Sequence, residues 1–219
     1  QTPAAHDTKA GEEMSGAVEQ TFVAADGAEL PGCVFSRPGK PLLLVFPGFG
    51  YTHRLPSFQR LLACLPYDIV VIDNRAHGND QEFGVERLCN DIVHFTTIYA
   101  RKRPDLIVFG HSLSATALLM VAPRMPPSVR FALFAPFRSI SHRAPAWGKT
   151  LMRAVRPFPP LSRLVLRLGL FITNVRTGNI RRTGLRGVFS RWGDCRIKGA
   201  SFNEFWDLSQ RFVFDFPRV

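Results

Sequence analysis

The chain has 219 residues, 46% of them hydrophobic and 21% charged, and a formal net charge of +11 at pH 7. This size and composition fit one globular domain with a substantial core and exclude an intrinsically disordered chain. No apolar run approaches the roughly 18–20 residues that cross a bilayer as a helix. The cysteines form no Cys-x-x-Cys pair, so we expect buried thiols rather than a disulfide framework or a metal site; they are Cys33, Cys64, Cys89 and Cys195.

The charge is unevenly distributed. Residues 1–120 hold 10 Lys and Arg against 13 Asp and Glu, whereas residues 121–219 hold 18 against 4. In the basic half, arginines are interleaved with apolar residues, as in residues 161–170, which is typical of an amphipathic helix. Three interpretations are open: a solvated helix face, attraction to an anionic or lipid-like substrate or membrane surface, and nucleic-acid binding, which the interleaving favours least.

The first structured element is predicted to be a β-hairpin. Residues 1–16 are small and polar and indicate a flexible N-terminal tail. Residues 18–23 and 30–35 are strand candidates, and Asp26-Gly27 between them favours a tight turn.

Strands and helices then alternate. Continuous apolar runs, typical of strands buried on both faces of a parallel sheet, cover residues 41–46, 68–73, 106–109 and 129–135. Helical patterns lie between these runs, at residues 55–65, 85–101 and 115–120. Residues 17–139 are therefore predicted to form an α/β core, a mostly parallel sheet with helices on both faces.

The pattern changes in residues 140–219, where Pro, Arg and short apolar runs dominate. We expect this region to form a basic helical lid with no clear further buried strand. Its helix candidates cover residues 147–155, 161–172, 183–192 and 202–212.

One stretch of the predicted core carries the chemistry. The strand at 106–109 ends at Gly110-His-Ser-Leu-Ser114, and a helix-compatible run follows. A serine on such a sharp strand-to-helix turn sits in strained backbone and needs small residues two positions to either side, because bulky side chains would clash. The N–H of Leu113 lies at the start of the helix, where the dipole favours an oxyanion. Ser112 is therefore a nucleophile candidate, and the alternative is an ordinary turn serine.

Two further loops accompany this turn. Val45-Phe-Pro-Gly-Phe-Gly50 follows one buried strand, and Asp73-x-Arg-x-His-Gly78 follows the next. In this order the three motifs resemble the α/β-hydrolase superfamily, especially its lysophospholipase-like and serine aminopeptidase-like members. The resemblance covers roughly residues 18–140.

The resemblance implies roles for residues of all three loops. Ser112 would be the nucleophile, and the turn at 110–114 that carries it would be the family's nucleophile elbow. The N–H groups of Phe49 and Leu113 would form the oxyanion hole, and the loop at 45–50 that carries Phe49 would be the oxyanion loop. The residues expected to bind substrate are Gly48, Gly50, Tyr51 and His111, although packing beneath the turn is the alternative for His111. His77 is expected to order its own loop, and His53 to line the pocket.

The sequence also departs from the family pattern. Pro47 stands where the family usually has His, and Ala76 where it usually has Gly. The family takes its acid and base from loops after the seventh and eighth strands, and this sequence ends just before the expected seventh strand, so we expect it to be C-terminally incomplete and to turn over little substrate. His142, the only histidine after Ser112, is the one candidate base; the alternative is a lid histidine.

The sequence thus predicts a serine hydrolase that cleaves an ester, thioester or small amide and needs no cofactor or metal. Its partner would be a small acyl or lipid-like substrate, with membrane contact through the basic lid. The alternatives are a non-catalytic or truncated binding protein of this fold, and a basic binder of membrane or nucleic-acid surfaces.

Overall fold

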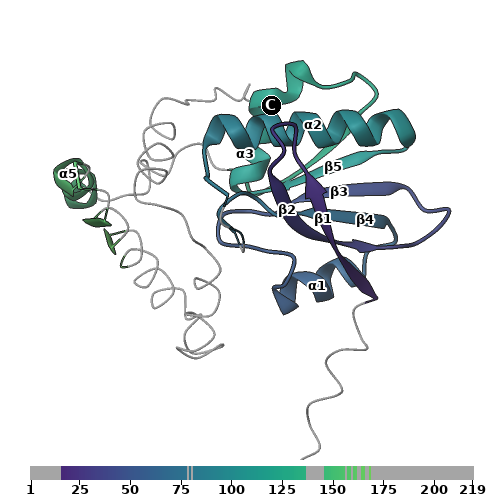
Figure 1. The fold of residues 1–219 in the computed structure, drawn as a ribbon, viewed down its shortest axis with the longest axis horizontal. Coiled ribbons are helices and arrows are strands. Elements are labelled where there is room, and N and C mark those ends of the chain that lie inside the picture. The colour runs from purple at the N-terminus through teal and green to yellow at the C-terminus, as the bar shows by residue number, and fades with distance from the viewer. Residues whose placement is uncertain are drawn as a thin grey trace, which may run out of the picture.

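A computed structural model of the chain describes residues 16–77, 79, 81–136 and 146–155, together with residues 157, 158, 160, 161, 164, 165 and 168. The strands in this part are β1 (Ala17–Val23), β2 (Glu29–Phe35), β3 (Leu42–Phe46), β4 (Asp68–Ile72), β5 (Ile107–His111) and β6 (Arg130–Phe134). The helices are α1 (Pro56–Ala63), α2 (Val85–Lys102), α3 (Leu113–Val121), the short 3-10 helix η1 (Ala122–Arg124) and α5 (Ala146–Val155) (Figure 1).

The strands form one sheet in the order β1-β2-β4-β3-β5-β6. The β1–β2 hairpin is antiparallel, and β2 pairs antiparallel with β4, whereas β4, β3, β5 and β6 run parallel. Because β3 lies between β4 and β5, the loops that follow these three strands meet at one edge of the sheet. In open α/β sheets such a reversal of strand order is where ligands bind.

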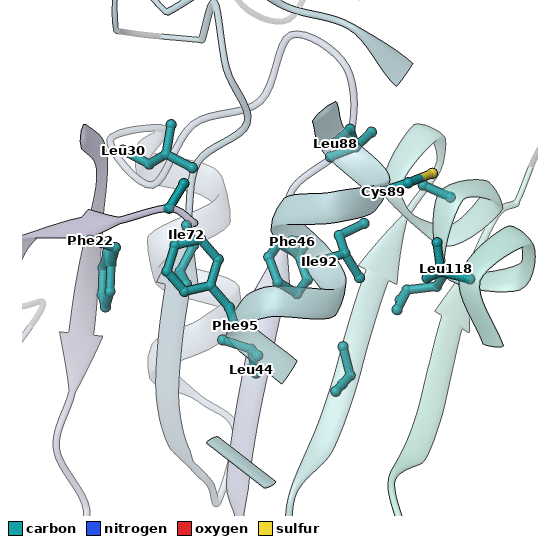
Figure 2. Close-up of a cluster of buried hydrophobic side chains, with 14 of the residues drawn as sticks. Phe22, Leu30, Leu44, Phe46, Ile72, Leu88, Cys89, Ile92, Phe95 and Leu118 are labelled. Atoms are coloured by element: carbon teal, nitrogen blue, oxygen red, sulfur yellow. The ribbon is translucent and has the colours of Figure 1, made fainter. Parts of the chain in front are cut away.

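The central strands are buried on both faces, which explains their uninterrupted apolar sequences. On β3, Leu42, Leu44 and Phe46 face α2 and α3, whereas Leu43 and Val45 belong to the cluster on the α1 face. Figure 2 shows the larger cluster, in which side chains of α2 lie against those of the strands. Figure 1 shows α1 on the opposite side of the sheet from α2 and α3. The predicted architecture is confirmed, including helices on both faces.

Two predictions about burial are wrong. The strand predicted at 129–135 exists as β6, but Phe131, Leu133 and Phe134 are 38%, 37% and 60% exposed. β6 is an edge strand of the described sheet, so it lacks the cover that the central strands receive from both faces. Cys64 is exposed, because it lies just past the C-terminal end of the short α1 helix. Cys33 and Cys89 are buried as predicted.

The predicted helix at 147–155 is confirmed as α5. Residues 161, 164, 165 and 168 are helical, in agreement with the helix predicted from residue 161 onward. Residues 1–15, the helix candidates at 183–192 and 202–212, and Cys195 lie outside the described residues. Within the described part, no helix has both the length and the apolar character required to cross a membrane.

Candidate active site

Ser112 occupies a strained turn between β5 and α3. Its φ of 51° and ψ of −108° lie in a region that non-glycine residues rarely adopt. Its N–H donates to the Phe134 carbonyl at 2.9 Å, and its own carbonyl accepts the N–H of Thr116 at 3.1 Å, which starts the helix. Ser112 is half-buried. Hydrogen bonds on both sides therefore hold the strained serine at the tip of the turn.

The position two residues before Ser112 accepts only glycine. A Cβ on Gly110 would lie 2.8 Å from the backbone N and Cα of Ala115 and 2.6 Å from the Leu118 Cδ1 atom. Backbone atoms cannot move away cheaply, so any larger residue would open the turn. The Leu113 side chain is buried, and its backbone N–H belongs to the first turn of α3, at the positive end of the helix dipole. This is where the sequence predicts an oxyanion-hole donor.

The loop after β3 lies directly against the turn that carries Ser112. A Cβ on Gly48 would come within 2.5 Å of the His111 Nδ1 atom and 3.1 Å of the His111 carbonyl oxygen. The Tyr51 N–H donates to the Gly48 carbonyl at 3.1 Å, and Gly50 has a φ of 75°, as a tight turn with glycine at its third position requires. The loop that carries Phe49 is thereby brought to the residue that precedes the candidate nucleophile.

His111 is enclosed by aromatic rings. The Tyr51 ring packs edge-on against it with centroids 4.9 Å apart, and the Phe134 ring lies 5.6 Å away. Burial lowers the pKa of His111 below its ordinary value and so favours the neutral ring. With Gly48 on a further side, His111 packs against the loop after β3, which is compatible with the alternative that it packs beneath the turn.

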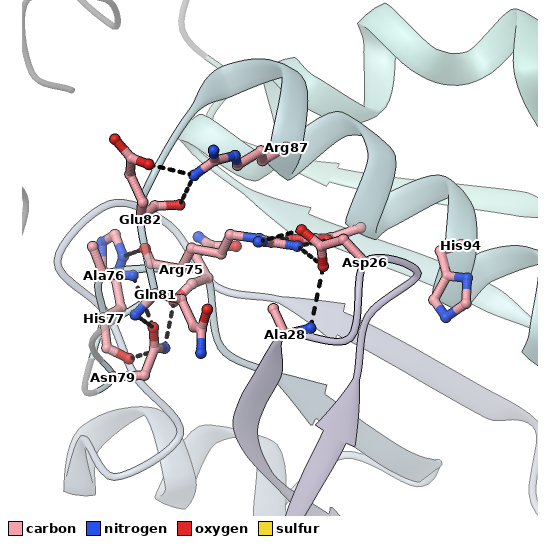
Figure 3. A network of polar contacts seen from close by, with 12 residues as sticks. Asp26, Ala28, Arg75, Ala76, His77, Asn79, Gln81, Glu82, Arg87 and His94 are labelled. Carbon is pink, nitrogen blue, oxygen red and sulfur yellow. Dashed lines mark hydrogen bonds and ion pairs between the residues drawn. The ribbon is translucent and has the colours of Figure 1, made fainter.

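The loop after β4 holds the loop after β3 in place through a hydrogen bond of His77. His77 is fully buried; its Nε2 accepts the N–H of Gly50 at 2.9 Å, and its Nδ1 donates to the Arg75 carbonyl at 2.8 Å. The Phe49 ring packs edge-on against the His77 ring at 5.6 Å. Figure 3 shows His77 beside Ala76 and Asn79 in this loop. The sequence predicts that His77 orders its own loop, but it gives no sign of the bond to Gly50.

Arg75 anchors the same loop to two other elements. It is buried and makes paired hydrogen bonds to Asp91 on α2, at 2.7 and 2.8 Å. A second pair of hydrogen bonds joins it to Asp26 in the β1–β2 turn, at 2.9 and 2.8 Å (Figure 3). Its hydrogen bonds lower the pKa of Asp26 to about 2. Ala76, which follows it, has a φ of 60°, the conformation that the family's glycine would adopt without strain.

His53 does not line a pocket, contrary to expectation. It is 1% exposed, and its Nδ1 lies 2.7 Å from Asp73 Oδ2, while Asp73 Oδ1 accepts the His53 N–H at 2.7 Å. Its Nε2 is 3.4 Å from the Glu19 carboxylate on β1. Burial alone would lower the pKa of His53, but the adjacent Asp73 carboxylate raises it above its ordinary value. The pair joins the loop before α1 to the end of β4.

A base for Ser112 is not evident among the described histidines. The described histidines have other contacts: His53 with Asp73, His77 with Gly50 and Arg75, His94 with the Val23 carbonyl, and His111 with its aromatic neighbours. His142 lies outside the described residues. Across the described ranges there is also no group of three or more His, Cys, Asp and Glu side chains that could hold a metal ion.

The buried His77 should make folding stability depend on pH. Burial lowers its pKa to about 4, below the ordinary value of about 6.5. Between these values the unfolded chain binds a proton that the folded chain does not, so the stability is fully present above about pH 6.5 and falls as the pH drops toward 4. We expect His77→Gln, whose amide offers a donor and an acceptor but cannot titrate, to remove about 3 kcal/mol of this change. Urea unfolding of both proteins at pH 7 and at pH 4 measures the difference; equal losses would contradict it.

A comparison with known protein families identifies the family to which the chain is similar. The family model described as the Alpha/beta hydrolase family matches residues 42–216. No curated protein matches the chain. Among solved structures, a hydrolase from Pseudomonas aeruginosa PA01 is 18% identical with a TM-score of 0.59, over 86% of this chain and 72% of that one. The alpha/beta hydrolase GrgF from Penicillium sp. sh18 is 15% identical with a TM-score of 0.58, over 90% and 75%.

A membrane phospholipase A, described as a bacterial virulence factor, is 18% identical with a TM-score of 0.53, over 93% of this chain and 66% of that one. Across eight matching structures, the chain spans between 39% and 75% of the other protein's length. The family match covers most of the sequence, and the order of the described strands, with β3 between β4 and β5, agrees with it. The chain belongs to the alpha/beta hydrolase family.

Proposed function

We propose that this protein is a serine hydrolase that cleaves an ester, thioester or small amide through Ser112. The observation that carries the proposal is the strained Ser112 backbone at the start of α3, with the oxyanion loop packed against it through Gly48 and His111. Strain of this kind costs about 1–3 kcal/mol and persists where the surroundings impose it, most often at functional sites. A serine in an ordinary turn would need no such backbone strain.

The proposed chemistry follows from this arrangement. The Ser112 hydroxyl attacks the acyl carbon, and its proton passes to a base, for which we propose His142. With this base the chain turns over substrate, in place of the low turnover expected from the positions at which the family usually carries its acid and base. The oxyanion that develops on the carbonyl oxygen accepts hydrogen bonds from the N–H groups of Phe49 and Leu113. The leaving group departs with the proton, and water then releases the acyl group from Ser112 by the same steps. Gly48, Gly50 and Tyr51 form the adjoining wall for the substrate, and His111 supports this wall by packing against Gly48 and the Tyr51 ring.

We further propose a lipid-like acyl substrate met at an anionic surface. Large apolar side chains are exposed in the described residues beyond β6: Trp147, Phe158, Leu161, Leu164 and Leu168. Residues 121–219 hold 18 Lys and Arg against 4 Asp and Glu. Apolar side chains among cations are what binds an anionic lipid interface. The similar membrane phospholipase A acts on lipids by its name, and the likeness supports the same substrate class here.

Hydrolysis of a matched series of 4-nitrophenyl esters tests this function. Acetyl, butyryl, octanoyl and dodecanoyl esters are presented in solution and in phosphatidylcholine vesicles with or without phosphatidylglycerol. We expect the longest acyl chain in anionic vesicles to be cleaved fastest, and added salt to reduce that advantage. Fastest cleavage of the acetyl ester, whatever the vesicle charge, would contradict the lipid-like substrate. Binding to vesicles without cleavage of any ester would favour a non-catalytic member of the family.

A further inference from the structure

We infer that Ser114 and Asn74 act together as a positioning pair for the oxyanion loop, which they hold through the carbonyl group of Pro47. The inference rests on the proposed function, since it concerns the geometry of the proposed oxyanion hole. Neither residue is expected to touch the substrate. Their effect on the reaction is exerted through the backbone of the loop after β3.

The three groups come from three neighbouring strand ends. Ser114 Oγ donates to the Pro47 carbonyl at 2.5 Å, and Asn74 Nδ2 donates to the same oxygen at 2.8 Å. Asn74 Nδ2 also lies 3.2 Å from Ser114 Oγ, so the two side chains bond to each other. Ser114 is 0% exposed and Asn74 3%. A carbonyl oxygen has two lone pairs, so two buried donors satisfy it fully and leave it one orientation.

The requirement for a small residue in the elbow does not explain this serine. Two positions after Ser112, glycine or alanine would also fit the turn. This chain instead places a hydroxyl there in a fully buried site, where an unbonded hydroxyl would cost about 1–3 kcal/mol. Its partners are on other loops, 40 and 67 residues away along the chain. The hydroxyl therefore has a role between loops, beyond the sterics of the elbow.

The bonded carbonyl is one of two fixed points around Phe49. Pro47 is held by Ser114 and Asn74, and Gly50 is held through its N–H by His77 Nε2 at 2.9 Å. The proposed oxyanion donor, the N–H of Phe49, lies between these two points. A hydrogen bond to a transition state depends steeply on the place of its donor, and a misplacement of about 1 Å can cost a hundredfold in rate. Release of one fixed point should therefore slow the reaction without loss of the nucleophile.

The test uses the whole chain and a fluorophosphonate probe. Ser112 Oγ forms a bond to phosphorus, fluoride leaves, the serine proton passes to the base, and the phosphoryl oxygen occupies the oxyanion hole. We expect Ser114→Ala to lower the limiting labelling rate by on the order of tenfold to a hundredfold, with the half-saturating probe concentration unchanged. Asn74→Ala should act in the same direction. The double variant should lose less than the product of the two effects, because both bonds meet at one oxygen.

Two controls separate positioning from general loss of stability. Ile92→Val trims a buried side chain of α2 and should leave both labelling constants as in the parent chain. Hydrogen exchange at the amides of residues 48–51 gives a readout that needs no activity. These amides should exchange faster in Ser114→Ala and not in Ile92→Val.

The outcomes are distinct. Labelling of the parent chain with an equal limiting rate in Ser114→Ala would overturn the positioning pair and leave the proposed function intact. No labelling of the folded parent chain would count against the proposed function; unchanged exchange at residues 48–51 would then overturn the pair as well. If Ser114→Ala raised the half-saturating probe concentration and left the limiting labelling rate unchanged, Ser114 would be assigned to substrate binding instead.

Discussion

Replacement of Ser112 by alanine should abolish hydrolysis of the preferred ester, a loss on the order of ten-thousandfold or more. The change removes one hydroxyl and leaves the backbone, the loop after β3 and the apolar surfaces as they are. The residual rate should stay above that of the ester in buffer, because the oxyanion donors and the substrate-binding surface remain. Steady-state hydrolysis of the two proteins, at matched concentration and with the fold checked by circular dichroism, measures the effect.

Two further variants test whether the loss is specific to the Ser112 hydroxyl and whether the Ser112 backbone is strained. Ser128→Ala removes an exposed serine beyond α3 and should retain the full rate. Ser112→Gly should be inactive and yet raise the free energy of unfolding by about 1 kcal/mol, because glycine adopts a φ of 51° without the strain that serine bears there. An active Ser112→Ala protein would contradict the account, and equal stability of serine and glycine at this position would contradict the strain.

Arg75→Ala should destabilise the fold by about 3–5 kcal/mol. The guanidinium is buried and satisfies the two carboxylate oxygens of Asp91, which is 5% exposed. Without it, the Asp91 carboxylate is left buried and unpaired, and the loop after β4 loses its attachment to α2 and to Asp26 in the β1–β2 turn. Urea unfolding at pH 7 gives the difference in free energy.

Arg87→Ala is the matched control. Arg87 and Glu82 also form an ion pair at 2.8 Å, but their side chains are 47% and 56% exposed. Figure 3 shows this pair in the same view as Arg75. Exposed pairs contribute about 0–1 kcal/mol. A loss in Arg75→Ala no larger than the loss in Arg87→Ala would contradict the structural role of the buried pair.

The sequence is sufficient to predict the core because its signals are local. The run at 41–46 alternates residues between two apolar faces, so it reads as a strand covered on both sides, and β3 is such a strand. Gly110 and Ser114 flank Ser112 at the spacing that a sharp turn requires, and the strained turn is present. Burial at the sheet edge is not a local property, which is why the exposure of Phe134 on β6 could not be predicted.

The contacts among loops could not be predicted because they depend on which strands are neighbours. Ser114 contacts Pro47 because β3 and β5 are adjacent in the sheet. His77 bonds to Gly50 because β3 and β4 are adjacent as well. The residue types alone gave a weak signal: a hydroxyl at Ser114 where a methyl group would suffice. For His53, nearness in sequence to the loop after β3 suggested a place in a pocket wall, but the side chain is buried and bonded to Asp73.

The central claim is that Ser112 is an activated nucleophile. The most direct test is to treat the folded chain with a fluorophosphonate probe, measure the intact mass and map the modified peptide. We expect one adduct, located on Ser112, and no adduct on Ser112→Ala under the same conditions. A folded chain that acquires no adduct, or one whose adduct lies on another residue, would contradict it.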